Sequence, residues 1–220
     1  MKLSSCWKTG LLLGLSLAAV RVPAAPLQRD LGLNLAYLRV HALPADLPAP
    51  GAVGKRPCVL DIRFVHGGRA DGAMLLAWLK AQAGARTPVF LLANRSTSGA
   101  LLSPLDSADA VVGLVILGPA AKDFAPDIAL PVTPEVDRRA YDALEKGASL
   151  DSLVVETLDK PRDDEAALAR SHLSDGDADV AAPASTPAAQ SPPLIDVVLQ
   201  RAIQLHRSLL ALKRIPGATP

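Results

Sequence analysis

The sequence is poor in aromatic residues: only seven of its 220 residues are Phe, Trp or Tyr. Half of the residues are hydrophobic, so aliphatic side chains and alanine must form the core, and the chain as a whole is too apolar to be disordered. A net basic charge is also lacking, because 23 Lys and Arg stand against 22 Asp and Glu. This balance argues against a nucleic-acid-binding protein. Two cysteines are too few for a disulfide framework.

Long apolar runs are scarce, and the one near the start, Leu11–Val20, is short. It follows the positive charges of Lys2 and Lys8 and precedes the small residues of Val22–Ala24. This pattern predicts a secretory signal peptide over residues 1–24, and hence a periplasmic or extracellular protein. Such a run is too short to span a bilayer, so no permanent membrane span is expected after cleavage. An uncleaved anchor or a core helix is the alternative.

Short apolar runs alternate with helical patterns through the middle of the chain. Strands are expected over 31–40, 58–65, 87–93, 110–117 and 127–133, and helices over 71–82, 100–105 and 134–146. This alternation predicts an α/β core over residues 25–158, with a mostly parallel sheet covered by helices. Cys58 lies within an apolar run and is expected to be a buried small hydrophobe rather than a nucleophile.

The alternation of strand and helix patterns ends in the last third of the sequence. Residues 159–193 are first acidic and then rich in proline and alanine, which predicts a flexible linker. Apolar residues then recur at helical spacing over 194–214, so a C-terminal amphipathic helix is expected. Packing of this helix back on the core is the favoured interpretation, and docking into a partner's groove is the alternative.

Two turns that follow predicted strands hold the candidate functional residues, because ligands bind at the carboxyl ends of parallel strands. In the first turn, Gly67 and Gly68 allow close approach of backbone N–H groups, as an oxyanion hole needs, although such pairs also form ordinary tight turns. In the second, Ser98 precedes a predicted helix. It is placed either to act as a nucleophile or to cap the helix.

A nucleophilic serine also needs a base. Among the four histidines only His66, beside the glycine pair, lies at a plausible place. Lys122 is the other option, since it follows the predicted strand 110–117 and a lysine in an apolar pocket can lose its proton near neutral pH. A solvated lysine is the alternative interpretation.

These residues together resemble the tail-specific (carboxyl-terminal-processing) serine peptidases of the ClpP/crotonase fold. That family shows D-L-R-x-N-x-G-G, which Asp61, Arg63, Gly67 and Gly68 match. Its nucleophile turn T-A-S-A-A-E is similar to Ser96–Leu101. The resemblance implies a Ser98/Lys122 dyad, an oxyanion hole from the N–H groups of Gly67, Gly68 and Gly99, a peptide or protein substrate, and no cofactor or metal. An oligomer is compatible with it.

The sequence also departs from the family pattern. Leu101 replaces the glutamate after the nucleophile, Val65 replaces the asparagine of the first motif, and no glycine flanks Lys122 directly. There is no room for a peptide-binding PDZ module. Two hypotheses follow: an exported serine peptidase that uses the Ser98/Lys122 dyad, and a catalytically inactive crotonase-like module that binds a peptide or partner protein in the cell envelope.

Overall fold

A computed structural model of the chain describes residues 27–49, 51–106, 111–155 and 193–216. Its centre is a six-stranded mixed sheet whose strands lie in chain order, β1 to β6. Their bounds are β1 (Leu27–Asp30), β2 (Ala36–Arg39), β3 (Cys58–Asp61), β4 (Val89–Leu92), β5 (Leu114–Gly118) and β6 (Ile128–Ala129). β1 is antiparallel to β2 and the other pairs are parallel. The predicted α/β class with a mostly parallel sheet is confirmed.

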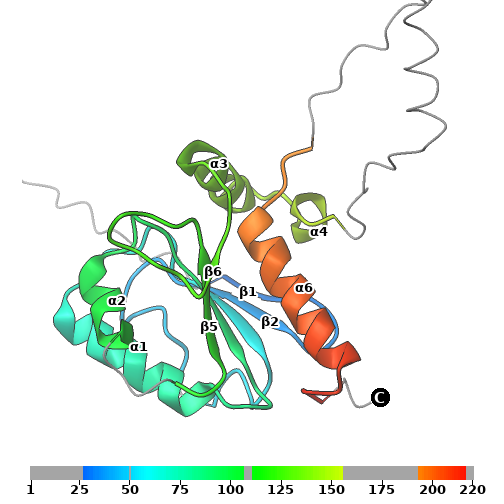
Figure 1. Ribbon diagram of the computed structural model, residues 1–220, viewed down its shortest axis with the longest axis horizontal. Coiled ribbons are helices and arrows are strands. Elements are labelled where there is room, and N and C mark those ends of the chain that lie inside the picture. Colours follow the sequence, from blue (N-terminus) through cyan, green and yellow to red (C-terminus); the bar gives the residue numbers. More distant parts are fainter. Residues whose placement is uncertain (1–26, 50, 107–110, 156–192, 217–220) are drawn as a thin grey trace, which may run out of the picture.

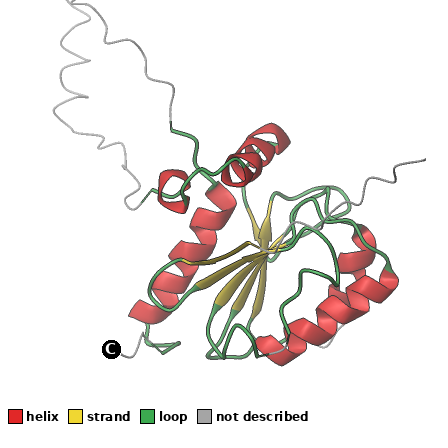
Figure 2. Ribbon diagram, turned by 180° about the vertical axis from the view of Figure 1, so that it is seen from behind, coloured by secondary structure: helices red, strands yellow, loops and turns green. Residues whose placement is uncertain are grey.

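Helices cover the sheet on both sides. They are α1 (Arg69–Gln82), α2 (Gly99–Asp106), α3 (Pro134–Glu145), α4 (Leu150–Leu153) and α6 (Val197–Ala211). Figure 1 shows α1 and α2 on one face of the sheet and α6 on the other, and the view from behind in Figure 2 shows the same three layers. The predicted signal peptide, residues 1–24, and all of the predicted linker except residue 193 lie outside the described residues.

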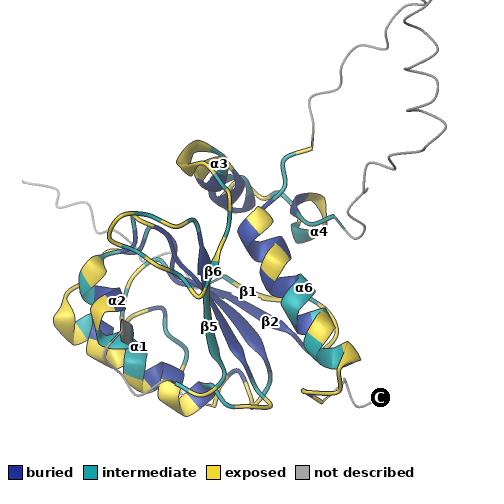
Figure 3. Ribbon diagram, in the orientation of Figure 1, coloured by how far each residue is buried: buried dark blue, intermediate teal, exposed yellow. Residues whose placement is uncertain are grey.

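The central strands are apolar without interruption because both of their faces are covered. In β3, Cys58 and Leu60 face the core under α1 and α2, whereas Val59 faces the core under α6. Phe90 of β4 likewise faces α6. Strands β2 to β4 are accordingly the most deeply buried part of the molecule (Figure 3).

The C-terminal helix packs back on the sheet, as the favoured interpretation expected. Val198, Leu199 and Ala202 on one side of α6 are buried in the core that Phe90 also joins. The alternative, an apolar helix face offered to a partner, is wrong because β4 and β5 already cover that face.

Three features of the backbone differ from the sequence-based expectation. The run 31–40 contains a turn, where Leu33 and Asn34 have positive φ, and only its second half is strand β2. The run 58–65 leaves the sheet after Asp61, since Val65 N–H donates to the Ile62 carbonyl and closes a turn. Helix α2 continues two residues beyond Pro104 to Asp106.

Candidate functional site

The turn between β4 and α2 holds Ser98 immediately before the helix, where the sequence placed it. Its hydroxyl donates a 2.8 Å hydrogen bond to the carbonyl oxygen of Gly67. Its backbone N–H donates a 2.9 Å bond to the carbonyl of Val65. Ser98 therefore joins this turn to the turn that follows β3.

Among the described residues, the acceptor of the Ser98 hydroxyl is an amide carbonyl and not a base. An amide carbonyl accepts the hydrogen bond but does not remove the proton, whereas a serine nucleophile needs a general base within hydrogen-bond reach. Within the described part of the chain, no hydrogen bond joins Ser98 to either Lys122 or His66. His66 is exposed.

The glycines of the predicted oxyanion hole have different surroundings. The Gly68 N–H donates a 2.8 Å bond to Asp71 Oδ2, which caps the start of α1. Gly67 packs tightly, since a Cβ there would lie 2.7 Å from Leu101 Cδ2. Gly99 is exposed, and a Cβ built on it meets nothing within 4 Å. An oxyanion would have to compete with Asp71 for the Gly68 N–H.

Lys122 occupies the tip of a tight turn between β5 and β6. Ala121 and Phe124 exchange two backbone hydrogen bonds, of 2.9 and 3.2 Å, and hold Lys122 and Asp123 between them. Both charged side chains are exposed. The turn places Lys122 beyond the carboxyl end of β5, the edge of the sheet where the β4–α2 turn also lies.

Lys122 and Gly99 line the same cavity, of about 380 Å³, whereas Ser98 does not line it. Asn94, Arg95 and Thr97 contribute to its wall from the β4–α2 turn. Thr97 and Gly99 line this cavity and Ser98 between them does not, while Ser96 lines a neighbouring cavity together with Lys122. Thr97 turns inward and donates a 3.1 Å bond to the Ile62 carbonyl.

Two further hollows share lining residues with this cavity, and we call the three together the Lys122 groove. One, of about 290 Å³, runs toward Phe64, Val132 and Pro134. The other, of about 320 Å³, is lined by Leu102, Ile116 and Phe124. Lys122 lines all three hollows, and Arg95 lines two of them.

Phe64, at one end of the Lys122 groove, has a left-handed backbone with φ of 64°. A bulky residue adopts this conformation only where its surroundings compensate the strain. Its ring packs edge-on against Tyr141, with centroids 4.9 Å apart, and the Arg138 guanidinium lies 4.7 Å from its centroid. The aromatic end of the groove is therefore held in place by α3.

A buried ion cluster centred on Arg63 adjoins the groove, because Asp137 belongs to both. All five of its N–H donors are used by the carboxylates of Asp61, Asp137 and Asp196, at 2.7 to 3.1 Å. Asp61, Arg63, Asp137 and Asp196 are each at most 2% exposed. The three carboxylates surround the Arg63 guanidinium, so its positive charge already lies between them.

The cluster continues along the face of the sheet toward α3. Side chains two apart in a strand share a face, so Tyr37 and Arg39 lie on the side of Asp61, which pairs in register with Arg39. Tyr37 OH donates a 2.8 Å bond to Asp61 Oδ2, and Arg39 Nε donates a 3.0 Å bond to Tyr37 OH. The Arg39 guanidinium stacks 4.0 Å from the Tyr141 ring centroid.

Opposing effects act on the pKa of Asp61. Burial raises it, but the positive charge and hydrogen bonds of Arg63, helped by Arg39, outweigh burial and hold the pKa of Asp61 below its ordinary value. Burial also raises the pKa of Tyr141 to about 12, with the charge of Asp61 acting in the same direction. Asp61 is therefore ionised, and Tyr141 neutral, near neutral pH.

Sequence reasoning found Asp61 and Arg63 only as motif residues and did not identify the cluster. Tyr37 and Arg39, two residues apart in a predicted strand, were a usable signal for such a cluster. A buried parallel strand that carries a charge needs an opposite charge on the same face. Nothing local in the sequence pointed to Asp137 or Asp196, which reach Arg63 from 74 and 133 residues away.

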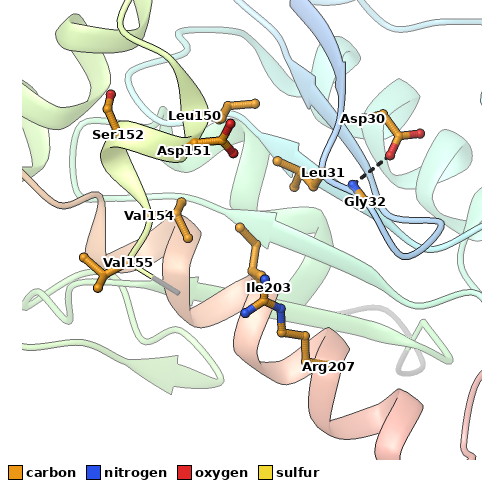
Figure 4. Close-up of a pocket in the computed structure, with 10 residues that line it drawn as sticks. All are labelled: Asp30, Leu31, Gly32, Leu150, Asp151, Ser152, Val154, Val155, Ile203 and Arg207. Atoms are coloured by element: carbon orange, nitrogen blue, oxygen red, sulfur yellow. Dashed lines mark hydrogen bonds between the residues drawn. The ribbon is translucent and has the colours of Figure 1, made fainter. Parts of the chain in front are cut away.

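A separate cavity of about 760 Å³ lies between the β1–β2 turn, α4 and α6 (Figure 4). Leu31, Val154 and Ile203 give it an apolar lining, and Asp151 and Arg207 line it with charge. The dashed bond in Figure 4 joins the Gly32 N–H to Asp30 Oδ1 at 2.8 Å. This cavity shares no lining residue with the Lys122 groove.

None of the helices in the described ranges is long and apolar enough to cross a membrane. The same ranges contain no group of three or more His, Cys, Asp or Glu side chains arranged to hold a metal ion. Comparison with known proteins found no family model that matches this chain and no curated protein that is similar to it.

Proposed function

We propose that this chain is an exported, non-catalytic module of the ClpP/crotonase type that binds a segment of a peptide or partner protein in the Lys122 groove. One observation carries the proposal: the Ser98 hydroxyl donates to the Gly67 carbonyl, and Ser98 lines none of the three hollows that Lys122 lines. A serine peptidase needs its nucleophilic hydroxyl within hydrogen-bond reach of a general base.

The surrounding groups support the same conclusion. The Gly68 N–H, an expected oxyanion donor, caps α1 through Asp71. Lys122 lies exposed at the tip of a turn between β5 and β6. Each group has an internal or solvated role, and none contacts the Ser98 hydroxyl.

The fold-level part of the proposal rests on the order of the motifs. The D-I-R-x-x-x-G-G segment follows β3 and the S-T-S-G turn follows the adjacent parallel strand β4, so both meet at one edge of the sheet. Export rests on the predicted signal peptide in residues 1–24. Binding in the groove agrees with the general position of ligands in α/β sheets, beyond the carboxyl ends of parallel strands.

An activity-directed fluorophosphonate probe tests the absence of catalysis. We expect no labelling of the folded protein, and the same result for Ser98→Ala, under conditions that label an active serine hydrolase. Circular dichroism confirms that both proteins are folded. Labelling of the wild type that disappears in both Ser98→Ala and Lys122→Met would overturn the proposal and establish the Ser98/Lys122 peptidase instead.

A further inference from the structure

The Lys122 groove has positive charge at its centre. Arg95 and Lys122 are both exposed, and within the described residues neither forms an ion pair. Both line the central cavity, Arg95 from the β4–α2 turn and Lys122 from the β5–β6 turn. Asp123 is an exposed carboxylate of the lining, whereas Asp137, which also lines the groove, is buried and paired with Arg63, so the exposed charges sum to one positive.

Both outer hollows of the groove have apolar side chains in their lining. Phe64, Val132 and Pro134 line one end, and Leu102, Ile116 and Phe124 line the other. An extended chain that occupies the three hollows passes the central one, which both cations line. Because a strand-like peptide rises about 3.3 Å per residue and alternates its side chains, an acidic residue at the centre has apolar neighbours two positions away on the same side.

We propose that the Lys122 groove binds an extended peptide segment in which an acidic side chain lies between two apolar ones. This inference rests on the proposed function, because it names the ligand class of the same groove. Burial of the apolar side chains supplies most of the affinity, and the two cations select the charge between them. Since the cations are exposed, salt weakens this selection.

Fluorescence anisotropy with three fluorescein-labelled probe peptides tests the inference. The probes share the sequence Gly-Leu-Ala-Xaa-Ala-Phe-Gly, in which Xaa is Glu, Gln or Lys. We expect the Glu probe to bind about tenfold more tightly than the Lys probe at low salt, and this ratio to fall at 0.5 M salt. The double variant Arg95→Glu/Lys122→Glu is expected to reverse the order of the probes.

A matched variant controls for the general charge of the protein. Lys80 is an exposed cation in the last turn of α1, outside the groove lining, and Lys80→Glu is expected to leave the preference for the Glu probe unchanged. Loss of the preference in Lys80→Glu, or its persistence in the double variant, would overturn the assignment to this groove.

The outcomes separate this inference from the proposed function. If all three probes bind equally and compete with one another, the groove binds peptides without selecting charge, so only the acidic ligand class is wrong. If no probe binds, both the ligand class and the binding function fail. If fluorophosphonate labels Ser98 while the Glu probe still binds preferentially, the module is catalytic and the ligand class stands.

Discussion

Arg63 donates two hydrogen bonds to the carboxylate of Asp196, of 3.1 and 2.8 Å, across 133 residues of sequence. Asp196 Oδ1 also accepts a 3.0 Å bond from the Leu199 N–H and so caps helix α6. One carboxylate therefore begins the C-terminal helix and attaches it to the turn after β3. The ion pair and the apolar face of α6 act together to hold this helix on the sheet.

Replacement of Asp196 by Ala should destabilise the protein strongly. It removes the helix cap and leaves two buried donors of Arg63 without acceptors, and breaking a buried ion pair in this way costs about 3–5 kcal/mol. Urea unfolding followed by circular dichroism measures the loss. Asp151→Ala, which removes an exposed carboxylate on α4, is the control and should change the free energy of unfolding by less than about 0.5 kcal/mol. Equal effects of the two substitutions would contradict the structural role of Asp196.

The stability should fall in acid because the pKa of Asp61 is lower in the folded protein than its ordinary value of about 3.9. The unfolded chain then binds more protons than the native state between the two pKa values, so stability rises with pH there. The contribution of Asp61 is complete above about pH 5 and is lost as the pH falls through the lowered pKa. Urea unfolding between pH 3 and pH 7 measures this dependence, and Asp61→Asn should reduce the slope. An unchanged slope in that variant would contradict the assignment.

Gly72→Ala should destabilise the protein although alanine is the better helix former. Gly72 is in the interior of α1, and a Cβ there would lie 2.5 Å from the Ala100 carbonyl oxygen of α2. Pro104, four residues after Ala100, has no N–H to bond that oxygen within the helix. Overpacking of this kind costs about 1–3 kcal/mol, more than the gain in helix propensity.

The control for Gly72 is Gly99→Ala, since a Cβ at position 99 meets nothing within 4 Å. Thermal unfolding should show a lower Tm for Gly72→Ala and little change for Gly99→Ala. A raised Tm for Gly72→Ala would show that α1 and α2 are not packed this closely.

Thiol accessibility should distinguish Gly99 from its neighbour Ser98. A cysteine at position 99 faces the Lys122 groove and should react rapidly with Ellman's reagent, whereas one at position 98 is half-buried and should react more slowly. In a Cys6→Ser background the native Cys58 should stay silent near neutral pH, because burial raises the pKa of its thiol to about 12. Faster reaction at position 98 would place that side chain in the groove and revive the nucleophile hypothesis.

Much of the fold was predictable because its causes are local. Apolar runs bounded by turn residues marked strands β3 to β6, and helical spacing marked α1, α3 and α6. Thr133 followed by Pro134 begins α3 with a cap and a proline at its first position, a signal that is visible without any tertiary contact. Strand β1 was missed because its four residues are mostly exposed and carry no apolar run.

The functional site was predictable only in its position. The sequence by itself determined the α/β class and the succession of strands and helices. It also determined that the Gly67–Gly68 and Asn94–Gly99 turns meet at one edge of the sheet, because parallel strands bring their carboxyl ends together. Only the tertiary structure decided that the Ser98 hydroxyl bonds to Gly67, that Gly99 but not Ser98 lines a cavity with Lys122, and that Arg63 meets Asp196. Periodicity sets the direction of side chains in helices and strands, but in a turn and in a buried ion cluster the direction depends on partners far away in the sequence.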